Sequence, residues 1–149
     1  MRVTDILRHK GGTVTTVAPS ATVEDAARIL GDRRIGALVV SEDGETVAGI
    51  LSERDVVAHL AAVGRDGLDS MVSAVMTRQV TTCSPQDSIE QLMRQMTAGR
   101  FRHLPVVVDG RLAGIVAFLL IERRLRELVP RRRPGARMAR DPTTTATQR

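Results

Sequence analysis

The 149-residue chain contains no Trp or Tyr, only two Phe, and a single cysteine, Cys83. One cysteine excludes an intramolecular disulfide and a cysteine-rich zinc site, and it fits a reducing cytoplasm. The scarcity of aromatic side chains disfavours the stacking platforms that bind single-stranded nucleic acid. Residues 1–10 lack the apolar core of a signal peptide, and the longest wholly apolar stretch, residues 115–121, is too short to cross a bilayer. The sequence therefore predicts a soluble cytoplasmic protein with no membrane partner.

The excess positive charge is confined to one end of the chain. The net charge is +5, and residues 130–149 contain six arginines against one aspartate, so residues 1–129 are neutral. The terminal stretch is rich in Pro, Arg and Thr, which predicts a disordered basic tail. Arginine clusters bind nucleic acid, and this alternative stays open, although no DNA-binding motif accompanies the tail and a solvated terminus is favoured.

Residues 1–129 contain an internal repeat. Residues 15–24 match residues 80–90, and Pro19 falls on Pro85. Further matching pairs are residues 3–7 with 72–76, 34–40 with 101–107, 43–44 with 109–110, and 49–51 with 114–116. Since the matches run through almost everything before the tail, the chain consists of two copies of one unit.

Each copy has the pattern strand, helix, strand, strand, helix. Thr22 and Ser88 have the character of helix N-caps, and Gly31 and Gly99 lie where the helices are expected to end. An Asp-Gly pair between two apolar runs predicts a hairpin in each copy. The expected strands are residues 13–17, 37–40, 47–51, 80–83, 104–108 and 112–116, and the second helix of each copy covers residues 53–63 or 118–129.

We predict an α+β fold in which two β-α-β-β-α repeats pack pseudo-symmetrically. A unit of roughly 60 residues is marginally stable alone, which favours packing of the two copies against each other. The predicted boundaries are residues 1–64 for the first repeat, 65–71 for a linker, 72–129 for the second repeat and 130–149 for the tail.

Residues 49–55, Gly-Ile-Leu-Ser-Glu-Arg-Asp, carry the strongest candidate site. A strand that turns directly into a helix presents free backbone N–H groups and the positive end of the helix dipole, which suit a phosphate. Ser52 adds a hydroxyl, Arg54 a cation and Asp55 a carboxylate that can bind a pair of vicinal hydroxyls. The alternative is plain helix capping by Ser52. The matching stretch, residues 114–120, keeps the strand-to-helix pattern without either polar group, which favours a ligand in the first copy.

The chain resembles a tandem pair of cystathionine-beta-synthase (CBS) domains, a Bateman module, and in particular the small bacterial proteins made of one such pair. The resemblance rests on residues 49–55 and on Phe101-Arg102-His103-Leu104-Pro105-Val106-Val107. It also rests on the Asp-Ile-Leu and Ala-Val-Met-Thr segments that begin the two copies, and on the Thr-Val-x-Pro and Thr-Cys-x-Pro strands. It implies two pseudo-symmetric clefts between the repeats that hold adenosine-type ligands, a regulatory role, and dimerisation through helices. Such a dimer is expected to bury Val56, Val57 and Leu60.

Carried over to this chain, the resemblance implies one ligand site with walls from both repeats. Ser52 would contact a phosphate, Asp55 the ribose hydroxyls, and arginines the phosphate oxygens. For His103, a strand histidine with a structural hydrogen bond is an equal alternative. The expected ligand-binding residues are Gly49, Ile50, Leu51, Ser52, Arg54 and Asp55 from the first repeat and Ser84, Ile89, Arg100, Arg102, His103, Leu104 and Pro105 from the second.

The second cleft departs from the family pattern. Ala117 replaces the hydroxyl, Leu120 replaces the carboxylate, and the partner position across the repeats is Ala18 instead of Ser84. Because little polar remains to fix a nucleotide there, Phe118, Leu119 and Leu120 are expected to fill that pocket. We predict one ligand per chain.

These observations favour a regulatory module that senses an adenine nucleotide such as AMP, ADP or ATP, with NADH and S-adenosylmethionine as further candidates. It would act as a homodimer on an unidentified protein. His9 and His59 have no metal-ligand spacing, and neither a nucleophile elbow nor a dinucleotide-binding glycine motif occurs, so no catalytic residue, metal or bound cofactor is expected. The alternatives are a ligand-free dimerisation module and a nucleic-acid-associated protein that acts through its arginine tail.

Overall fold

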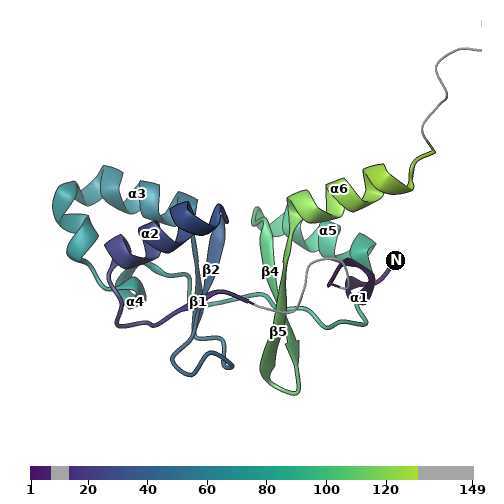
Figure 1. Ribbon diagram of the computed structural model, residues 1–149, viewed down its shortest axis with the longest axis horizontal. Coiled ribbons are helices and arrows are strands. Elements are labelled where there is room, and N and C mark those ends of the chain that lie inside the picture. The colour runs from purple at the N-terminus through teal and green to yellow at the C-terminus, as the bar shows by residue number, and fades with distance from the viewer. Residues whose placement is uncertain (8–13, 131–149) are drawn as a thin grey trace, which may run out of the picture.

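The computed structural model describes residues 1–7 and 14–130, which form two halves of similar architecture set side by side (Figure 1). In both halves the longer helices lie at one end of the strands and the hairpin turns at the other. The elements of the first half are β1 (Thr16–Val17), α2 (Val23–Arg33), β2 (Ala37–Val40), β3 (Gly49–Ser52) and α3 (Glu53–Val63). Those of the second half are α5 (Ile89–Gly99), β4 (His103–Val108), β5 (Arg111–Ala117) and α6 (Phe118–Leu128). Three short helices complete the described chain, namely α1 (Val3–Leu7), the 3-10 helix η1 (Arg65–Asp69) and α4 (Val72–Val75).

The sheets confirm the predicted α+β fold with one difference between the halves. The first sheet has the order β1-β2-β3, with β1 parallel to β2 and β2 antiparallel to β3. The second sheet contains only β4 and β5, because the strand predicted at residues 80–83 reduces to one parallel bridge between Cys83 and Val106. The prediction of a full strand there is wrong, and the residues before Cys83 run along the boundary between the halves instead.

The structure also fixes the register of the repeat. Arg34 and Arg100 occupy the same position after the first helix of each half, and Ala37 and His103 each begin a strand. Residues 34–40 therefore correspond to residues 100–106, and the predicted match with 101–107 is wrong by one position.

The helix starts follow the predicted capping residues. Thr22 accepts a hydrogen bond from the Asp25 N–H (3.1 Å) while its own N–H donates to the Asp25 carboxylate (3.2 Å), which completes a capping box. Ser88 likewise accepts from the Gln91 N–H at 3.2 Å. Each side-chain cap satisfies a backbone donor that the first turn of a helix leaves without a partner.

The helices end close to the two predicted glycines. Gly31 lies inside α2 and Gly99 is the last residue of α5, while the left-handed cap positions belong to Arg34 (φ 52°) and Arg100 (φ 56°). Gly99 has a packing role, because a Cβ there would overlap the ring of Phe101.

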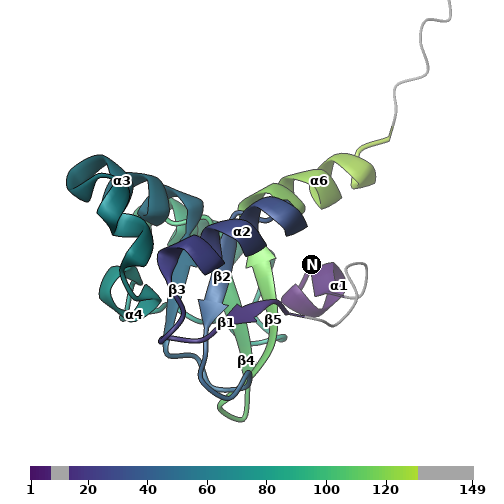
Figure 2. The same cartoon turned by 60° about the vertical axis from the view of Figure 1, so that its left-hand side comes forward.

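The two hydrophobic cores exchange their short opening helices. Val3 and Ile6 of α1 pack in the core of the second half, whereas Val72 of α4 and Met76 pack in the core of the first half. Figures 1 and 2 both show α1 beside the second half and α4 beside the first. The cores therefore do not coincide with the sequence repeats 1–64 and 72–129.

Matching hydrogen bonds hold the exchanged helices α1 and α4 in place. The N–H groups of Val3 and Thr4 donate to the carbonyls of Asp87 and Pro85 (both 3.0 Å). In the other half, the N–H of Val72 donates to the Ala21 carbonyl (2.8 Å), and that of Ser73 donates to the carbonyl of Pro19 (3.0 Å). Pro19 and Pro85, which align in the sequence repeat, thus accept equivalent hydrogen bonds from the opening helix of the other repeat.

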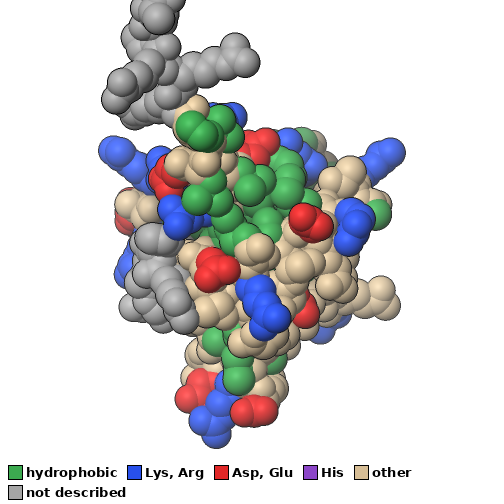
Figure 3. All heavy atoms as spheres, turned by 90° about the vertical axis from the view of Figure 1, so that its right-hand side faces the viewer, with side chains coloured by type: hydrophobic (Ala, Val, Ile, Leu, Met, Phe, Trp, Pro, Cys, Tyr) green, Lys and Arg blue, Asp and Glu red, His purple; other side chains and the backbone are tan. Residues whose placement is uncertain are grey.

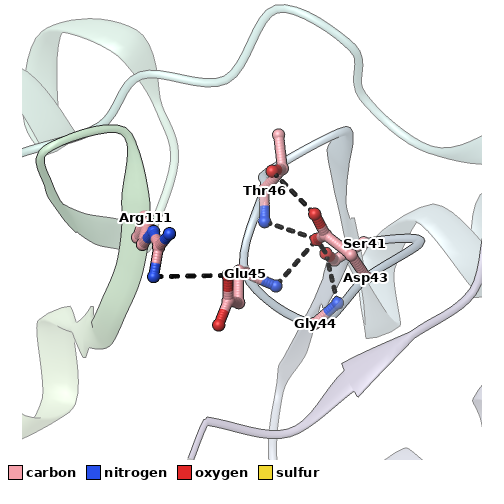
Figure 4. A network of polar contacts seen from close by, with 6 residues as sticks. All are labelled: Ser41, Asp43, Gly44, Glu45, Thr46 and Arg111. Atoms are coloured by element: carbon pink, nitrogen blue, oxygen red, sulfur yellow. Dashed lines mark hydrogen bonds and ion pairs between the residues drawn. The ribbon is translucent and has the colours of Figure 1, made fainter.

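The halves also touch at their hairpin turns (Figure 4). The N–H of Leu112 donates to the Glu45 carbonyl (2.6 Å), and the Glu45 carboxylate lies 3.7 Å from the Arg111 guanidinium. The Asp43 carboxylate fixes the loop by accepting from the backbone N–H groups of Thr46 (2.7 Å) and Glu45 (2.9 Å). These N–H groups and the Thr46 hydroxyl hold the pKa of Asp43 well below its usual range.

One predicted surface residue is internal. Val56 is only 6% exposed and belongs to the core of the first half, so its assignment to an exposed dimer face is wrong. Val57, on another side of α3, is 66% exposed, and Leu60 packs partly against the core.

Candidate functional site

A cavity of about 480 Å³ lies between the two halves, at the opposite end of the strands from the hairpin turns. Its volume is within the range of small-molecule sites. Seven of the thirteen residues expected to bind ligand line it: Ile50, Ser52, Arg54, Asp55, Arg100, Arg102 and His103. The first half supplies the end of β3 and the start of α3, and the second half supplies the segment between α5 and β4.

Alternation along β3 decides which motif side chains reach the cavity. Successive strand residues point to opposite faces, so Ile50 and Ser52 share the cavity side. Leu51 points the other way and is fully buried in the first core. The Leu51 side chain therefore does not line the cavity, and its contact with a base stays a prediction.

Ser52 and Asp55 form a capping box at the start of α3. The Asp55 N–H donates to Ser52 Oγ (3.1 Å), and the Ser52 N–H donates to Asp55 Oδ2 (2.9 Å). Ser52 therefore does cap the helix, but both side chains keep hydrogen-bonding capacity for a ligand. Ser52 still has a hydroxyl hydrogen to donate, and Asp55 Oδ1 can accept from a hydroxyl group.

The equivalent helix of the second half shows that the fold manages without this box. Helix α6 follows directly from β5 at Ala117, which makes no side-chain cap bond, and still extends over the same length as α3. The polar pair in the cavity is therefore not a requirement of the strand-to-helix turn.

Gly49, the first residue of the motif, packs away from the cavity. A Cβ on Gly49 would lie 2.6 Å from Met76 Sδ and 2.9 Å from the Thr77 carbonyl oxygen. Its counterpart Gly114 gives similar room to Leu7, since a Cβ there would lie 2.8 Å from Leu7 Cδ2. Gly49 therefore makes room for the segment that follows α4, and Gly114 makes room for the last residue of α1. A contact between Gly49 and a base stays a prediction.

The remaining expected residues of the second repeat also lie outside the cavity. Leu104 and Ile89 are buried in the second core, and Pro105 is buried next to Leu104 with its carbonyl bonded to the Cys83 N–H (2.9 Å). The N–H of Ser84 donates to the Asp87 carboxylate (2.8 Å) in the turn before α5. These four residues are core and turn residues that do not line the cavity, and a role for them in ligand binding stays a prediction.

Residues 77–81 form a wall of the cavity that the sequence did not indicate. Thr77 and Ile50 exchange two backbone hydrogen bonds, at 2.9 and 3.0 Å, which draws the chain after α4 alongside β3. Gln79, Val80 and Thr81 then line the cavity. No local pattern marks this pairing, because it depends on where α4 packs in the first half.

Gly36, Ala37, Glu53, Gly99 and Phe101 are the other lining residues that sequence reasoning missed. Gly36 comes directly before β2 and faces the ring of His103, which begins β4. The place of Gly36 before an apolar strand is a sequence signal for a lining residue, but its contact with His103 leaves no such signal.

The region equivalent to the second cleft is only partly described, because residues 8–13 lie outside the described ranges. Phe118 and Leu120 pack against the second core, whereas Leu119 is 67% exposed. The number of ligands per chain stays a prediction.

Two features are absent from the described residues. Within residues 1–7 and 14–130, no group of three or more His, Cys, Asp or Glu side chains could hold a metal ion. In the same part of the chain, none of the helices has the length and apolar character that crossing a membrane needs. His9 and residues 131–149, with the predicted basic tail, fall outside the described residues.

Known proteins share both the repeat and the architecture. The family model of the CBS domain matches residues 3–62 and 72–118. The CBS domain-containing protein YhcV of Bacillus subtilis is 36% identical over 104 residues, which is 70% of this chain and 73% of YhcV. The crystal structure of the CBS-domain protein ATU1752 from Agrobacterium tumefaciens superposes with a TM-score of 0.79 at 43% identity, covering 83% of this chain and 99% of that one.

A third similar protein carries ligands. The CBS domain pair of MJ0100, in complex with 5'-methylthioadenosine and S-adenosyl-L-methionine, is 26% identical with a TM-score of 0.75, over 85% of this chain and 97% of its own. The two in-phase family matches and the shared architecture identify the two halves as a pair of CBS domains. The chain belongs to the CBS-domain family.

Proposed function

We propose that this protein is a regulatory module that binds an adenine nucleotide in the cavity between its two CBS domains and transmits occupancy to a partner protein. The observation that carries the proposal is the Ser52–Asp55 pair, which lines the cavity although the equivalent helix α6 forms without such a pair. The adenosine compounds bound to the MJ0100 pair support the ligand class.

The cavity offers each part of a nucleotide a suitable surface. Ile50 and Val80 supply apolar contacts for a base, and Asp55 Oδ1 can accept hydrogen bonds from ribose hydroxyls. The Ser52 hydroxyl and the nearby arginines can donate to phosphate oxygens. The site therefore suits binding, and we expect regulation without catalysis.

Occupancy can change the angle between the halves. The cavity has walls from both halves, whereas the Glu45–Leu112 contact joins them at the hairpin end. A ligand that contacts both walls would favour one relative orientation over others, in proportion to its difference in affinity for them. The surface shown to a partner would change accordingly.

We also propose that the module is a homodimer. Large apolar side chains are exposed on the two outer helices, Val57 and Val63 on α3 and Leu119, Leu125 and Leu128 on α6. Figure 3 views the end of the molecule that carries α6 and shows hydrophobic side chains gathered over its upper part. A second copy that covers these helices would remove this surface from water.

Calorimetric titration with AMP, ADP, ATP, NADH and S-adenosylmethionine tests the proposal. Asp55→Asn keeps the shape of the cap but weakens the acceptor for ribose, and we expect it to lower affinity roughly tenfold. Asp25→Asn is the matched control, because Asp25 forms the same capping box at the start of α2 without lining the cavity. Equal binding by the Asp55 variant would exclude this site.

The alternatives give different results. Absence of heat with every ligand, together with dimerisation, would identify a ligand-free dimerisation module. Salt-sensitive retention on DNA that disappears when residues 130–149 are deleted would identify a nucleic-acid-associated protein.

A further inference from the structure

The two hairpins of the molecule have connecting loops of different length. Residues 41–48 connect β2 to β3, whereas only Asp109 and Gly110 connect β4 to β5. Because two residues are enough to reverse the chain in one half, the longer loop of the other half is not a requirement of the hairpin. The longer loop is the one that contacts the other half, as Figure 4 shows.

Hydrogen bonds within the longer loop hold it in one conformation. Asp43 Oδ1 accepts from the backbone N–H groups of Thr46 (2.7 Å) and Glu45 (2.9 Å). The hydroxyl of Ser41, a buried residue, donates to the same oxygen (3.1 Å) and accepts from the Gly44 N–H (2.9 Å). The loop backbone is therefore fixed on both sides of Glu45.

Glu45 joins this loop to the second half in two ways. The Leu112 N–H donates to the Glu45 carbonyl (2.6 Å), and the Glu45 carboxylate lies 3.7 Å from the guanidinium of Arg111. The Arg111 and Glu45 side chains are 73% and 58% exposed, so water screens their ion pair and leaves it little effect on stability. The backbone bond, named the Glu45–Leu112 bond below, is therefore the stronger of the two links.

A bulge in β5 lies next to this bond. The register pairs Val107 with Leu112 and Val106 with Gly114, so Ala113 is skipped. Such an extra residue bends a strand and changes the direction of the groups beside it. Since β5 is also an edge strand of a two-stranded sheet, the Leu112 N–H can bond to the first half without breaking the ladder to β4.

The Glu45–Leu112 bond and the cavity lie at opposite ends of the same strands. Ser52 ends β3 and His103 begins β4, and both residues line the cavity. Strand β5 extends about 20 Å from the hairpin turn to Ala117, which pairs with His103. The halves are therefore bonded at one end of the strands and separated by a cavity of about 480 Å³ at the other.

The outer helices begin at the cavity end. Helix α3 starts at Glu53, directly after β3, and α6 starts at Phe118, directly after β5. A rotation of the halves about a fixed point at the hairpin end would therefore move both helix starts together with the cavity walls. The angle between α3 and α6 would change, and with it the exposed apolar surface of these helices.

We infer that the Glu45–Leu112 bond is the hinge of the protein. Nucleotide binding rotates the two CBS domains about this bond, so that the cavity walls and the outer helices move while the hairpin ends stay together. The inference rests on the proposed nucleotide site and adds to it the point about which the domains turn. The fixed loop around Glu45 restricts the motion to rotation, because it prevents the hairpin ends from sliding apart.

Distances between paired spin labels in the full chain test the inference. In a Cys83→Val background, Asp32→Cys with Ala98→Cys labels equivalent exposed positions near the ends of α2 and α5, beside the cavity. Glu42→Cys with Val108→Cys labels exposed positions at the two hairpins. Labelled chains are diluted with unlabelled ones, so that distances between copies do not contribute. With ATP or AMP, we expect a shift of roughly 2 Å or more at the cavity end and a smaller one at the hairpin end.

Variants of the hairpin contact test the role of the bond itself. Leu112→Pro removes the donor N–H, and an edge strand tolerates proline. We expect this variant to widen the distance distribution at the hairpin end and to lose the one-ended shift. Asp43→Ala frees the loop while leaving β5 unchanged, and it should act in the same direction even if Leu112→Pro does not fold. Arg111→Gln is the matched control, because it removes only the exposed ion pair and should change neither distance.

The outcomes separate the hinge from the proposed function. Calorimetric binding with equal shifts at both ends, or with no shift at either, would overturn the hinge and leave the nucleotide site standing. Unchanged hairpin-end distances in both Leu112→Pro and Asp43→Ala would overturn it as well. If no nucleotide binds, the proposed function fails, and the free protein still tests the hinge. We expect a broader distribution at the cavity end than at the hairpin end, and equal widths would contradict it.

Discussion

A Cβ on Gly36 would lie 3.2 Å from both Cε1 and Nε2 of His103, and 3.7 Å from Oε1 of Glu53. Gly36 precedes β2 in the first half and His103 begins β4 in the second, so this approach brings the two CBS domains together at the wall of the cavity. The missing side chain of the glycine is what leaves room for the imidazole.

Larger residues at Gly36 should therefore disturb the site more than the fold. We expect Gly36→Val to displace His103 and to weaken nucleotide binding roughly tenfold, with Gly36→Ala intermediate. Calorimetry gives the affinities. Gly31→Ala is the control, because nothing lies within 4 Å of a Cβ there and alanine favours the helix. Unchanged affinity in Gly36→Val would show that His103 has no part in the site.

The two motif glycines should respond differently to the same substitution. A Cβ on Gly49 meets the Thr77 carbonyl at 2.9 Å, and backbone cannot move out of the way easily. At Gly114 the obstacle is the end of the Leu7 side chain, which can change rotamer. We expect Gly49→Ala to lower the unfolding free energy by about 2 kcal/mol and Gly114→Ala by less than half of that. Urea denaturation of both variants measures the difference, and equal losses would contradict this explanation.

Helix α6 should gain from the cap that it lacks. Ala117 occupies the N-cap with extended backbone (φ −99°, ψ 143°) but has no side-chain acceptor. Ala117→Ser should raise the unfolding free energy by about 1 kcal/mol. Thr22→Ala, which removes an existing cap, should lower it by a similar amount. A thermal melt that does not rise for Ala117→Ser would mean that the first turn of α6 is satisfied in another way.

Cys83 should be protected from thiol reagents in the folded protein. Burial, aided by the negative charge of Asp87, raises the pKa of the thiol to about 12. At pH 8 the reactive thiolate is therefore scarce, and we expect a thiol-specific dye to label the protein only at the rate at which it unfolds. Rapid labelling without denaturant would contradict the buried position.

The same pKa predicts an alkaline loss of stability. The unfolded thiol ionises near pH 8.5, whereas the folded thiol keeps its proton until about pH 12, so stability falls as the pH rises between these values. Cys83→Val should remove this part of the pH dependence, since its counterpart Val17 is a valine in an equivalent core.

Asp43 should contribute to stability with the opposite dependence on pH. Its pKa is lowered by the N–H groups of Thr46 and Glu45 and by the Thr46 hydroxyl, so its contribution is present above the unfolded pKa of about 4. It is lost as the pH falls below that value toward the folded pKa. Asp43→Asn should be less stable than the native chain at pH 7, with a difference that shrinks in acid.

Local sequence patterns predicted most of the fold. The repeat, the hairpins and the helix starts follow from Asp-Gly pairs, apolar periodicity and capping residues, which act over a few positions. Helix α3 begins at Glu53, directly after the Ser52 cap that the motif indicated. The exchange of α1 and α4 was not predictable in this way, because it depends on packing between segments far apart in the chain.

The site was predictable only in part, for two physical reasons. Strand alternation, which can be read from the sequence, assigns Ile50 to the cavity and Leu51 to the core. In contrast, the wall made by residues 77–81 results from the backbone pairing of Thr77 with Ile50, and backbone pairing leaves no signature in side-chain identity.

The exchange of helices α1 and α4 determines how the two domains respond to destabilisation. Each core is completed by a helix that the sequence assigns to the other repeat, so neither CBS domain can be excised at the linker with its interior intact. Heat or denaturant should therefore melt both halves in a single transition. A destabilising substitution at Val72, inside the second repeat by sequence, should open the domain whose Ser52 and Asp55 line the cavity.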